Sequence, residues 1–169
     1  MKKILVSVLA AIMLGSTLTA CGKSNTEKPG ASSGKEDTIN ISTKEIAEAI
    51  NEKIQVRMPQ PVDDNMAKDL FQLNLDDVEE YNIISTGISP GVDTIAIVKA
   101  KEGKVENVKT SFEKYLEIKK QPPVYPVDLE TLESAKIEEK GNYIALLITM
   151  ENEGVNVDTA SKIFNEKLK

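Results

Sequence analysis

Apolar residues recur every three or four positions in several stretches after residue 41, which is the spacing of one face of an α-helix. Ser42 and Glu45 have the spacing of a capping box, and Ile41 and Ile46 are placed as its hydrophobic staple. Lysines and glutamates fill the face opposite the apolar one in 104–120. The predicted helices are 42 to just before Pro59, 63–73, 104–120, 128–134 and 156–168.

Two pairs of segments are instead rich in branched apolar residues and are separated by turn sequences, which predicts two β-hairpins. The predicted strands are 81–88 and 93–100 in the first hairpin, and 135–139 and 142–150 in the second. Ser89-Pro90-Gly91 and Lys140-Gly141 form the two turns. Residues 144–148 are continuously apolar, which is typical of a central strand covered on both faces.

The main elements follow the order helix, helix, hairpin, helix, hairpin, helix, and this order predicts one α+β domain over 39–169. We expect two layers, with an antiparallel sheet built from the two hairpins and helices packed mainly on one face. The aromatic residues are expected in its core, Tyr125 and Tyr143 with their hydroxyls in water and the phenylalanines fully buried. These phenylalanines are Phe71, Phe112 and Phe164.

Residues 1–20 have the organisation of a secretory signal peptide. Lys2 and Lys3 precede an apolar run over 4–14, which is shorter than the roughly 20 residues needed to cross a bilayer. Residues 21–38 are rich in Gly, Ser, Lys and Glu, and we expect them to form a flexible linker.

The signal peptide ends in Leu18, Thr19, Ala20 and Cys21, which resemble the lipobox of bacterial lipoproteins. The resemblance implies that Cys21 receives a diacylglyceryl group and that a signal peptidase cuts between Ala20 and Cys21. The acyl chains would then hold the protein on the outer face of the cytoplasmic membrane, at roughly 0.8 kcal/mol per buried CH₂. The alternatives are an uncut anchor and a buried, unmodified Cys21.

The composition excludes several classes of chemistry. The chain has no histidine and one cysteine, so it can form neither a Ser-His-Asp triad nor a Cys/His zinc site. Its net charge of −6 disfavours a nucleic-acid partner. We therefore expect a protein that is not an enzyme and holds no cofactor, with a carboxylate-based hydrolase as the residual enzymatic alternative.

Carboxylates are the most plentiful reactive groups and could in principle bind Ca²⁺. The candidate groups are Asp63-Asp64, Asp76-Asp77 with Glu79-Glu80, and Glu151-Asn152-Glu153-Gly154 with Asn156 and Asp158. Negative charge and Asn are also favoured at helix starts and turns, and the chain lacks an EF-hand loop. We therefore expect capping roles and no metal site, and we read 121–126 as a connection rather than a polyproline ligand.

The stretch 92–149 resembles the domain-of-unknown-function family 4358, uncharacterised lipoproteins of Gram-positive bacteria, and the similarity would cover roughly 41–164. The resemblance rests on the strand that begins at Asp93, on Tyr125-Pro126, on the segment that begins at Leu132, and on Lys140-Gly141 with its following strand. It implies a fold and a location, and it supplies no site residues. Two functions remain open: an envelope lipoprotein that binds an unknown envelope protein, and a lipoprotein that binds a small solute or a cation such as Ca²⁺.

Overall fold

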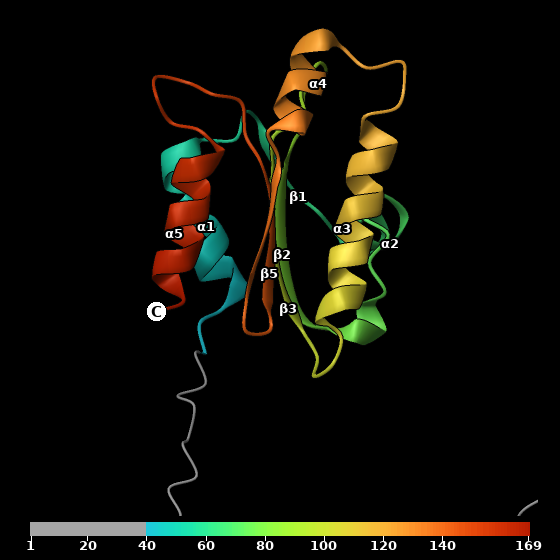
Figure 1. Ribbon diagram of the computed structural model, residues 1–169, viewed down its shortest axis with the longest axis vertical. Helices are drawn as coiled ribbons and strands as arrows, with labels where there is room; N and C mark the ends of the chain where they lie inside the picture. The colour runs from blue at the N-terminus through green and yellow to red at the C-terminus, as the bar shows by residue number, and fades with distance from the viewer. Residues whose placement is uncertain (1–39) are drawn as a thin grey trace, which may run out of the picture. The chain divides into compact units, whose positions relative to one another are not determined.

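The computed structural model describes residues 40–169, which form a five-stranded antiparallel sheet between helices (Figure 1). The predicted signal peptide, Cys21 and the linker lie outside these described residues. The strands are β1 (Pro59–Pro61), β2 (Val78–Thr86), β3 (Thr94–Ala100), β4 (Lys136–Lys140) and β5 (Tyr143–Ile148). The helices are α1 (Thr43–Ile54), α2 (Asp64–Asp69), the short 3-10 helix η1 (Leu75–Asp77), α3 (Val105–Lys119), α4 (Pro126–Glu133) and α5 (Val157–Lys167).

The two predicted hairpins are β2–β3 and β4–β5, and they join into a single sheet. The strand order is β1-β2-β3-β5-β4, so β3 and β5 pair with each other at the centre. Every residue of β5 is buried, as its continuously apolar sequence predicts. The α+β class is therefore confirmed.

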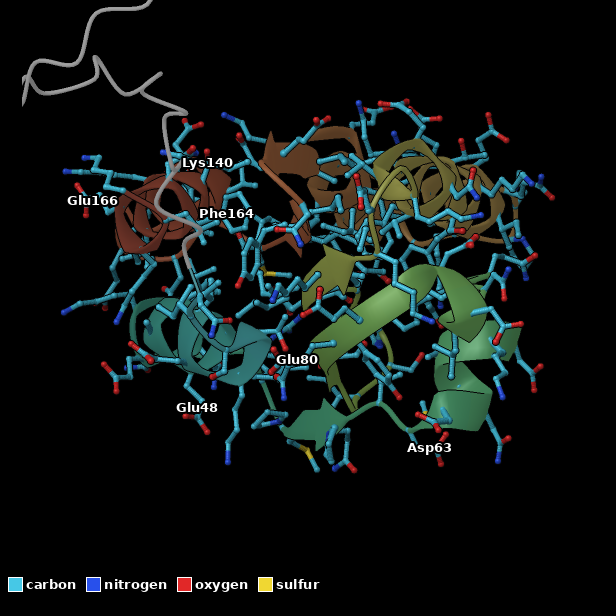
Figure 2. All side chains as sticks on the ribbon, turned by 90° about the horizontal axis from the view of Figure 1, so that it is seen from below. Glu48, Asp63, Glu80, Lys140, Phe164 and Glu166 are labelled. Carbon is cyan, nitrogen blue, oxygen red and sulfur yellow. The ribbon has the colours of Figure 1, made fainter. Side chains whose placement is uncertain are left out.

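The helices cover both faces of this sheet, rather than mainly one as the sequence suggested. Phe164 of α5 packs with α1 against one face, and Phe112 of α3 packs against the other. Figure 2 shows Phe164 pointing inward from α5, while Glu166 of the same helix points outward. The reason lies in the central strands, whose side chains are apolar on both faces and need a cover on each.

The helix starts follow the predicted caps. Ser42 Oγ accepts a hydrogen bond from the Glu45 N–H at 3.1 Å, and Asp63 Oδ1 accepts one from the Met66 N–H at 2.8 Å. Asn156 Oδ1 accepts the Asp158 N–H at 3.0 Å at the start of α5. The side chain of Glu45 extends to Lys167 at the end of α5, at 3.2 Å, so this carboxylate ties the two helices together.

The edge strand β1 was not predicted, because its Pro-Gln-Pro sequence indicates the end of a helix. The Met58 carbonyl accepts a hydrogen bond from the Gly87 N–H at 3.0 Å, and the Val62 N–H donates into β2 at 3.0 Å. Met58, Gln60 and Val62 therefore turn their backbone N–H and C=O groups toward β2. The backbone groups of Pro59 and Pro61 face away from it. Since proline has no N–H, this edge of the sheet offers no donor at either outward position.

Tyr125 lies on the surface, which contradicts its predicted place in the core. It occupies the N-cap position of α4 and its side chain is 57% exposed. Pro126 begins the helix, so the aromatic side chain is held outside the first turn. Tyr143 is buried as predicted, but its hydroxyl donates to the Ile41 carbonyl at 2.7 Å rather than to water alone.

Candidate functional site

A cavity of about 500 Å³ lies at one end of the sheet, between α4 and the start of α5. It is lined from three segments: α4 with the residue after it, the residues that follow β5, and the first turn of α5. Figure 1 places α4 and the β5–α5 connection at the same end of the sheet. Ligand pockets commonly have volumes of about 300–1,000 Å³, so a small molecule would fit.

Three carboxylates surround this cavity. Glu130 comes from α4, Glu151 follows β5, and Asp158 belongs to the first turn of α5. Asp158 pairs with Lys136 of β4 at 2.5 Å, whereas Glu130 and Glu151 have no ion pair within the described part of the chain. The cavity therefore has an excess of negative charge.

The buried side of the cavity includes a hydroxyl without a partner. Thr149 is 3% exposed, and its Oγ1 has no hydrogen-bond partner among residues 40–169. The neighbouring Thr131 differs, because its hydroxyl donates to the Val127 carbonyl at 2.8 Å. A buried polar group left unpaired costs roughly 1–3 kcal/mol, so Thr149 is an unusual feature of this end of the sheet.

Asp93 holds the chain in position where it enters the cavity. Its Oδ1 accepts a hydrogen bond from the Met150 N–H at 2.8 Å, and its Oδ2 accepts one from Arg57 at 2.8 Å. The carboxylate is 6% exposed. Neither residue was assigned a role from the sequence, although Arg57 is the only arginine in the chain and could have been singled out on that ground.

The acidic residues at 63–64 and 76–77 lie at the starts of α2 and η1, as predicted, and Asp63 caps α2. Asp64 accepts a hydrogen bond from the Tyr81 hydroxyl; burial and this carboxylate raise the pKa of Tyr81 to about 12. Asp77 accepts hydrogen bonds from the Asn107 amide at 2.8 Å and pairs with Lys104 at 3.0 Å. Both interactions lower the pKa of Asp77.

The glutamates at 79–80 also serve the fold. Glu79 pairs with Lys99 at 2.6 Å, and Glu80 accepts the Thr43 N–H at 3.1 Å at the start of α1. Residues 40–169 contain no group of three or more acidic or cysteine side chains that could hold a metal ion. The structure does not bring the predicted acidic pairs together into one site.

Some residues of the oxygen-rich loop at 151–158 line the cavity, and others stabilise the loop itself. Glu151, Asn156 and Asp158 line the cavity, while Asn152 forms a β-bridge with Val155. The sequence therefore singled out one wall of the site. It missed Glu130 and Thr149, which are distant along the chain and carry no motif.

A second opening, of about 270 Å³, lies beside β1 and is mostly apolar. Its walls include Phe71 and Tyr115, whose rings stack at a centroid distance of 4.4 Å. Met66 of α2 and Leu70, the residue that caps its C-terminus, line this opening and are 38% and 46% exposed. We call these two residues and the opening the α2 groove. It places two exposed apolar side chains beside an apolar opening.

Residues 121–125 connect α3 to α4, as predicted, and are mostly exposed, whereas Pro126 already begins α4. None of the helices within residues 40–169 has the length and apolarity needed to cross a membrane.

A comparison with protein families matched residues 52–149, which is more than half of the chain. The matching family is described as a domain of unknown function (DUF4358). The match spans the sheet up to the end of β5 and leaves out most of α1 and all of α5. Comparisons with curated proteins and with solved structures gave no match.

Proposed function

The chain belongs to the DUF4358 family of unknown function, and on that premise we propose that it is a lipid-anchored extracytoplasmic protein that binds another envelope protein and catalyses no reaction. The observation that carries the proposal is the sequence from Leu18 to Cys21. Here an aliphatic residue, two small residues and the only cysteine follow a signal-like apolar run. Diacylation of Cys21 would place residues 40–169 outside the cell on a linker of about 17 residues.

The α2 groove supports a protein as the partner. Exposed apolar surface is used for protein contacts where it is contiguous, and the α2 groove places two exposed apolar side chains beside an apolar opening. Met66 lies on α2 and Leu70 is its C-cap residue, one helical turn further on, so they present a short apolar ridge. The absence of histidine from the sequence, and the engagement of the buried carboxylates of Asp77 and Asp93 in hydrogen bonds and ion pairs, support a binding role over a catalytic one.

The anchor is tested by membrane fractionation of the Cys21→Ala chain. We expect this variant to keep the mobility of its uncut precursor, because it has no thiol to acylate. Thr17→Ala, just outside the lipobox, is the matched control and should fractionate as the unsubstituted chain does. A Cys21→Ala chain that stays in the membrane with unchanged mobility would refute the lipoprotein assignment.

The protein partner is tested by cross-linking in cells with Leu70→Asp. We expect this charge to abolish a cross-linked envelope protein that the unsubstituted chain captures. Tyr125→Asp is the control, since Tyr125 is also exposed, at 57% against 46% for Leu70, and it lies at the N-cap of α4, outside the α2 groove. Equal capture by the two variants would show that the α2 groove is not the binding surface.

A second candidate function, binding of a small solute or a cation such as Ca²⁺, is favoured by the acidic cavity between α4 and α5. A thermal-shift screen with Ca²⁺ and small solutes tests it. A ligand at 100 times its dissociation constant stabilises a protein by about 2.7 kcal/mol, which is readily measured. No shift with any ligand would exclude this candidate and leave the protein-binding function in place.

A further inference from the structure

We propose that the cavity between α4 and α5 binds a small aliphatic amine, with Glu130 and Glu151 receiving its ammonium groups. The inference rests on the second candidate function, solute binding, and names the chemical class of the solute. It is carried by the size of the cavity, its uncompensated charge, its mixed lining and a buried hydroxyl that lacks a partner.

The negative charge of the cavity favours a cationic ligand. Three carboxylates face one ammonium group, that of Lys136, which is already paired with Asp158 at 2.5 Å. The start of α5 carries a partial positive charge, but the Asn156 side chain accepts its first free N–H groups at 3.0 and 3.3 Å. Glu130 and Glu151 are therefore available to bind a cation.

The arrangement of the carboxylates selects an organic cation over a metal ion. A divalent metal needs oxygen ligands that converge to about 2.0–2.6 Å from one point. The described residues contain no such acidic group, here or elsewhere. A flexible diamine has no such requirement, since each ammonium group can meet a different carboxylate.

The rest of the lining fits the aliphatic part of such a ligand. Val127, Met150 and Val157 contribute apolar surface between the carboxylates. Burial of methylene groups against this surface is favourable by about 0.8 kcal/mol for each CH₂. A chain of a few methylene groups with charged ends therefore matches both the charge and the apolar part of the cavity.

Thr149 adds a polar group on the inner side of the cavity. It is 3% exposed, and its Oγ1 has no partner within residues 40–169. A hydroxyl oxygen accepts a hydrogen bond from an ammonium group, which is a donor only. An amine that reaches Thr149 would satisfy the one lining hydroxyl that the protein leaves unpaired.

The test is isothermal titration calorimetry of the full chain in detergent, with 1,5-diaminopentane as the probe. Its neutral counterpart, 1,5-pentanediol, has the same length without the charges. We expect the diamine to bind at least tenfold more tightly than the diol. Equal binding of the two compounds, or no heat with either, would overturn the proposal.

Variants place the binding in the cavity. Glu130→Gln with Glu151→Gln should weaken binding of 1,5-diaminopentane at least tenfold, and Thr149→Val should weaken it several-fold. Glu113→Gln removes an exposed carboxylate of α3 that has no ion pair within residues 40–169. We expect it to change the affinity for 1,5-diaminopentane less than twofold. The glutamates of the cavity are exposed, so their substitution leaves the fold intact, and circular dichroism verifies this. An equal loss in Glu113→Gln would show that the binding is non-specific.

The thermal-shift screen separates failure of this inference from failure of solute binding as a function. Stabilisation by Ca²⁺ or by a neutral solute, with none by the diamine, would overturn the amine and keep the solute-binding function. No stabilisation by any compound would overturn both. Stabilisation by the diamine that the double Gln variant loses supports both.

Discussion

Arg57 donates two hydrogen bonds to one oxygen of Asp93, from Nε at 3.1 Å and from Nη2 at 2.8 Å. The other oxygen of Asp93 accepts the Met150 N–H at 2.8 Å. One buried carboxylate thus joins the segment after α1, the start of β3 and the end of β5. Arg57 and Met150 lie 36 and 57 residues from Asp93 in sequence, so Asp93 fixes the end of the sheet that carries the cavity.

Removal of this carboxylate should destabilise the domain strongly. Asp93→Ala leaves the Met150 N–H unpaired and removes the partner of Arg57, and we expect a loss of about 3 kcal/mol in the free energy of unfolding. Asp93→Asn keeps an acceptor for Met150 and should lose less. Urea denaturation measures both values.

The control for the two Asp93 variants is Glu113→Gln, which removes an exposed carboxylate that has no ion pair in the described structure. We expect it to change the free energy of unfolding by less than about 0.5 kcal/mol. If Asp93→Ala proved as mild as this control, Asp93 would not organise the end of the sheet.

Much of the fold could be predicted from local sequence, because helix periodicity, caps and turns act over a few residues. The capping roles of Ser42, Asp63 and Asn156 are examples, and all three were predicted. The strand β1 could not be predicted, since its two prolines indicate a break and only its pairing with β2 makes it a strand.

The placement of helices on the two faces of the sheet, and the assembly of the cavity, depend on long-range packing. Local sequence patterns do not predict such packing. The apolar run of β5 predicted cover on both faces, but nothing in the sequence said which helix covers which face. The candidate site shows the same limit. The loop at 151–158 stood out by composition, whereas Glu130 and Thr149 become significant only when α4 and β5 meet at the cavity.

The two faces of the sheet should contribute independently to stability. Ile97 of β3 is fully buried under α1 and α5, and Ile148 of β5 is fully buried on the face covered by α3. We expect Ile97→Val and Ile148→Val each to cost about 1 kcal/mol, and the double variant to cost about 2 kcal/mol. Chemical denaturation tests this additivity. A negligible effect at either position would mean that its face is uncovered.

Asp77 should contribute to acid sensitivity. Hydrogen bonds from Asn107 and Lys104 lower its pKa below the ordinary value of 3.8, so its charged form stabilises the folded state. This contribution is complete above the ordinary pKa and is lost as the pH falls through the lower, folded pKa. We expect Asp77→Asn to be less stable at neutral pH and to lose less stability on acidification than the unsubstituted chain. Asp69→Asn, an exposed aspartate, should follow the unsubstituted chain.

Tyr81 should make the domain sensitive to alkali. Burial and the hydrogen bond to Asp64 raise its pKa from 10.0 to about 12, so the neutral phenol is favoured in the folded state. The resulting stability is complete below the ordinary pKa and is lost as the pH rises through the raised value. Asp64→Asn should move the phenol titration, followed by ring NMR signals assigned with Tyr81→Phe, toward 10. An unchanged titration in Asp64→Asn would mean that burial alone raises the pKa.

The prolines of β1 should prevent the sheet from pairing with a second chain. Pro59 and Pro61 occupy the two positions whose backbone faces away from β2, and neither has an N–H to donate. Replacement of both by threonine supplies two donors and a residue favoured in strands, so we expect self-association to increase over that of the unsubstituted chain. Light scattering over a concentration series measures it. Gln60→Thr is the matched control, because it changes the same strand at a position whose backbone already faces β2. If the double proline variant associates no more than this control, the prolines do not protect the edge.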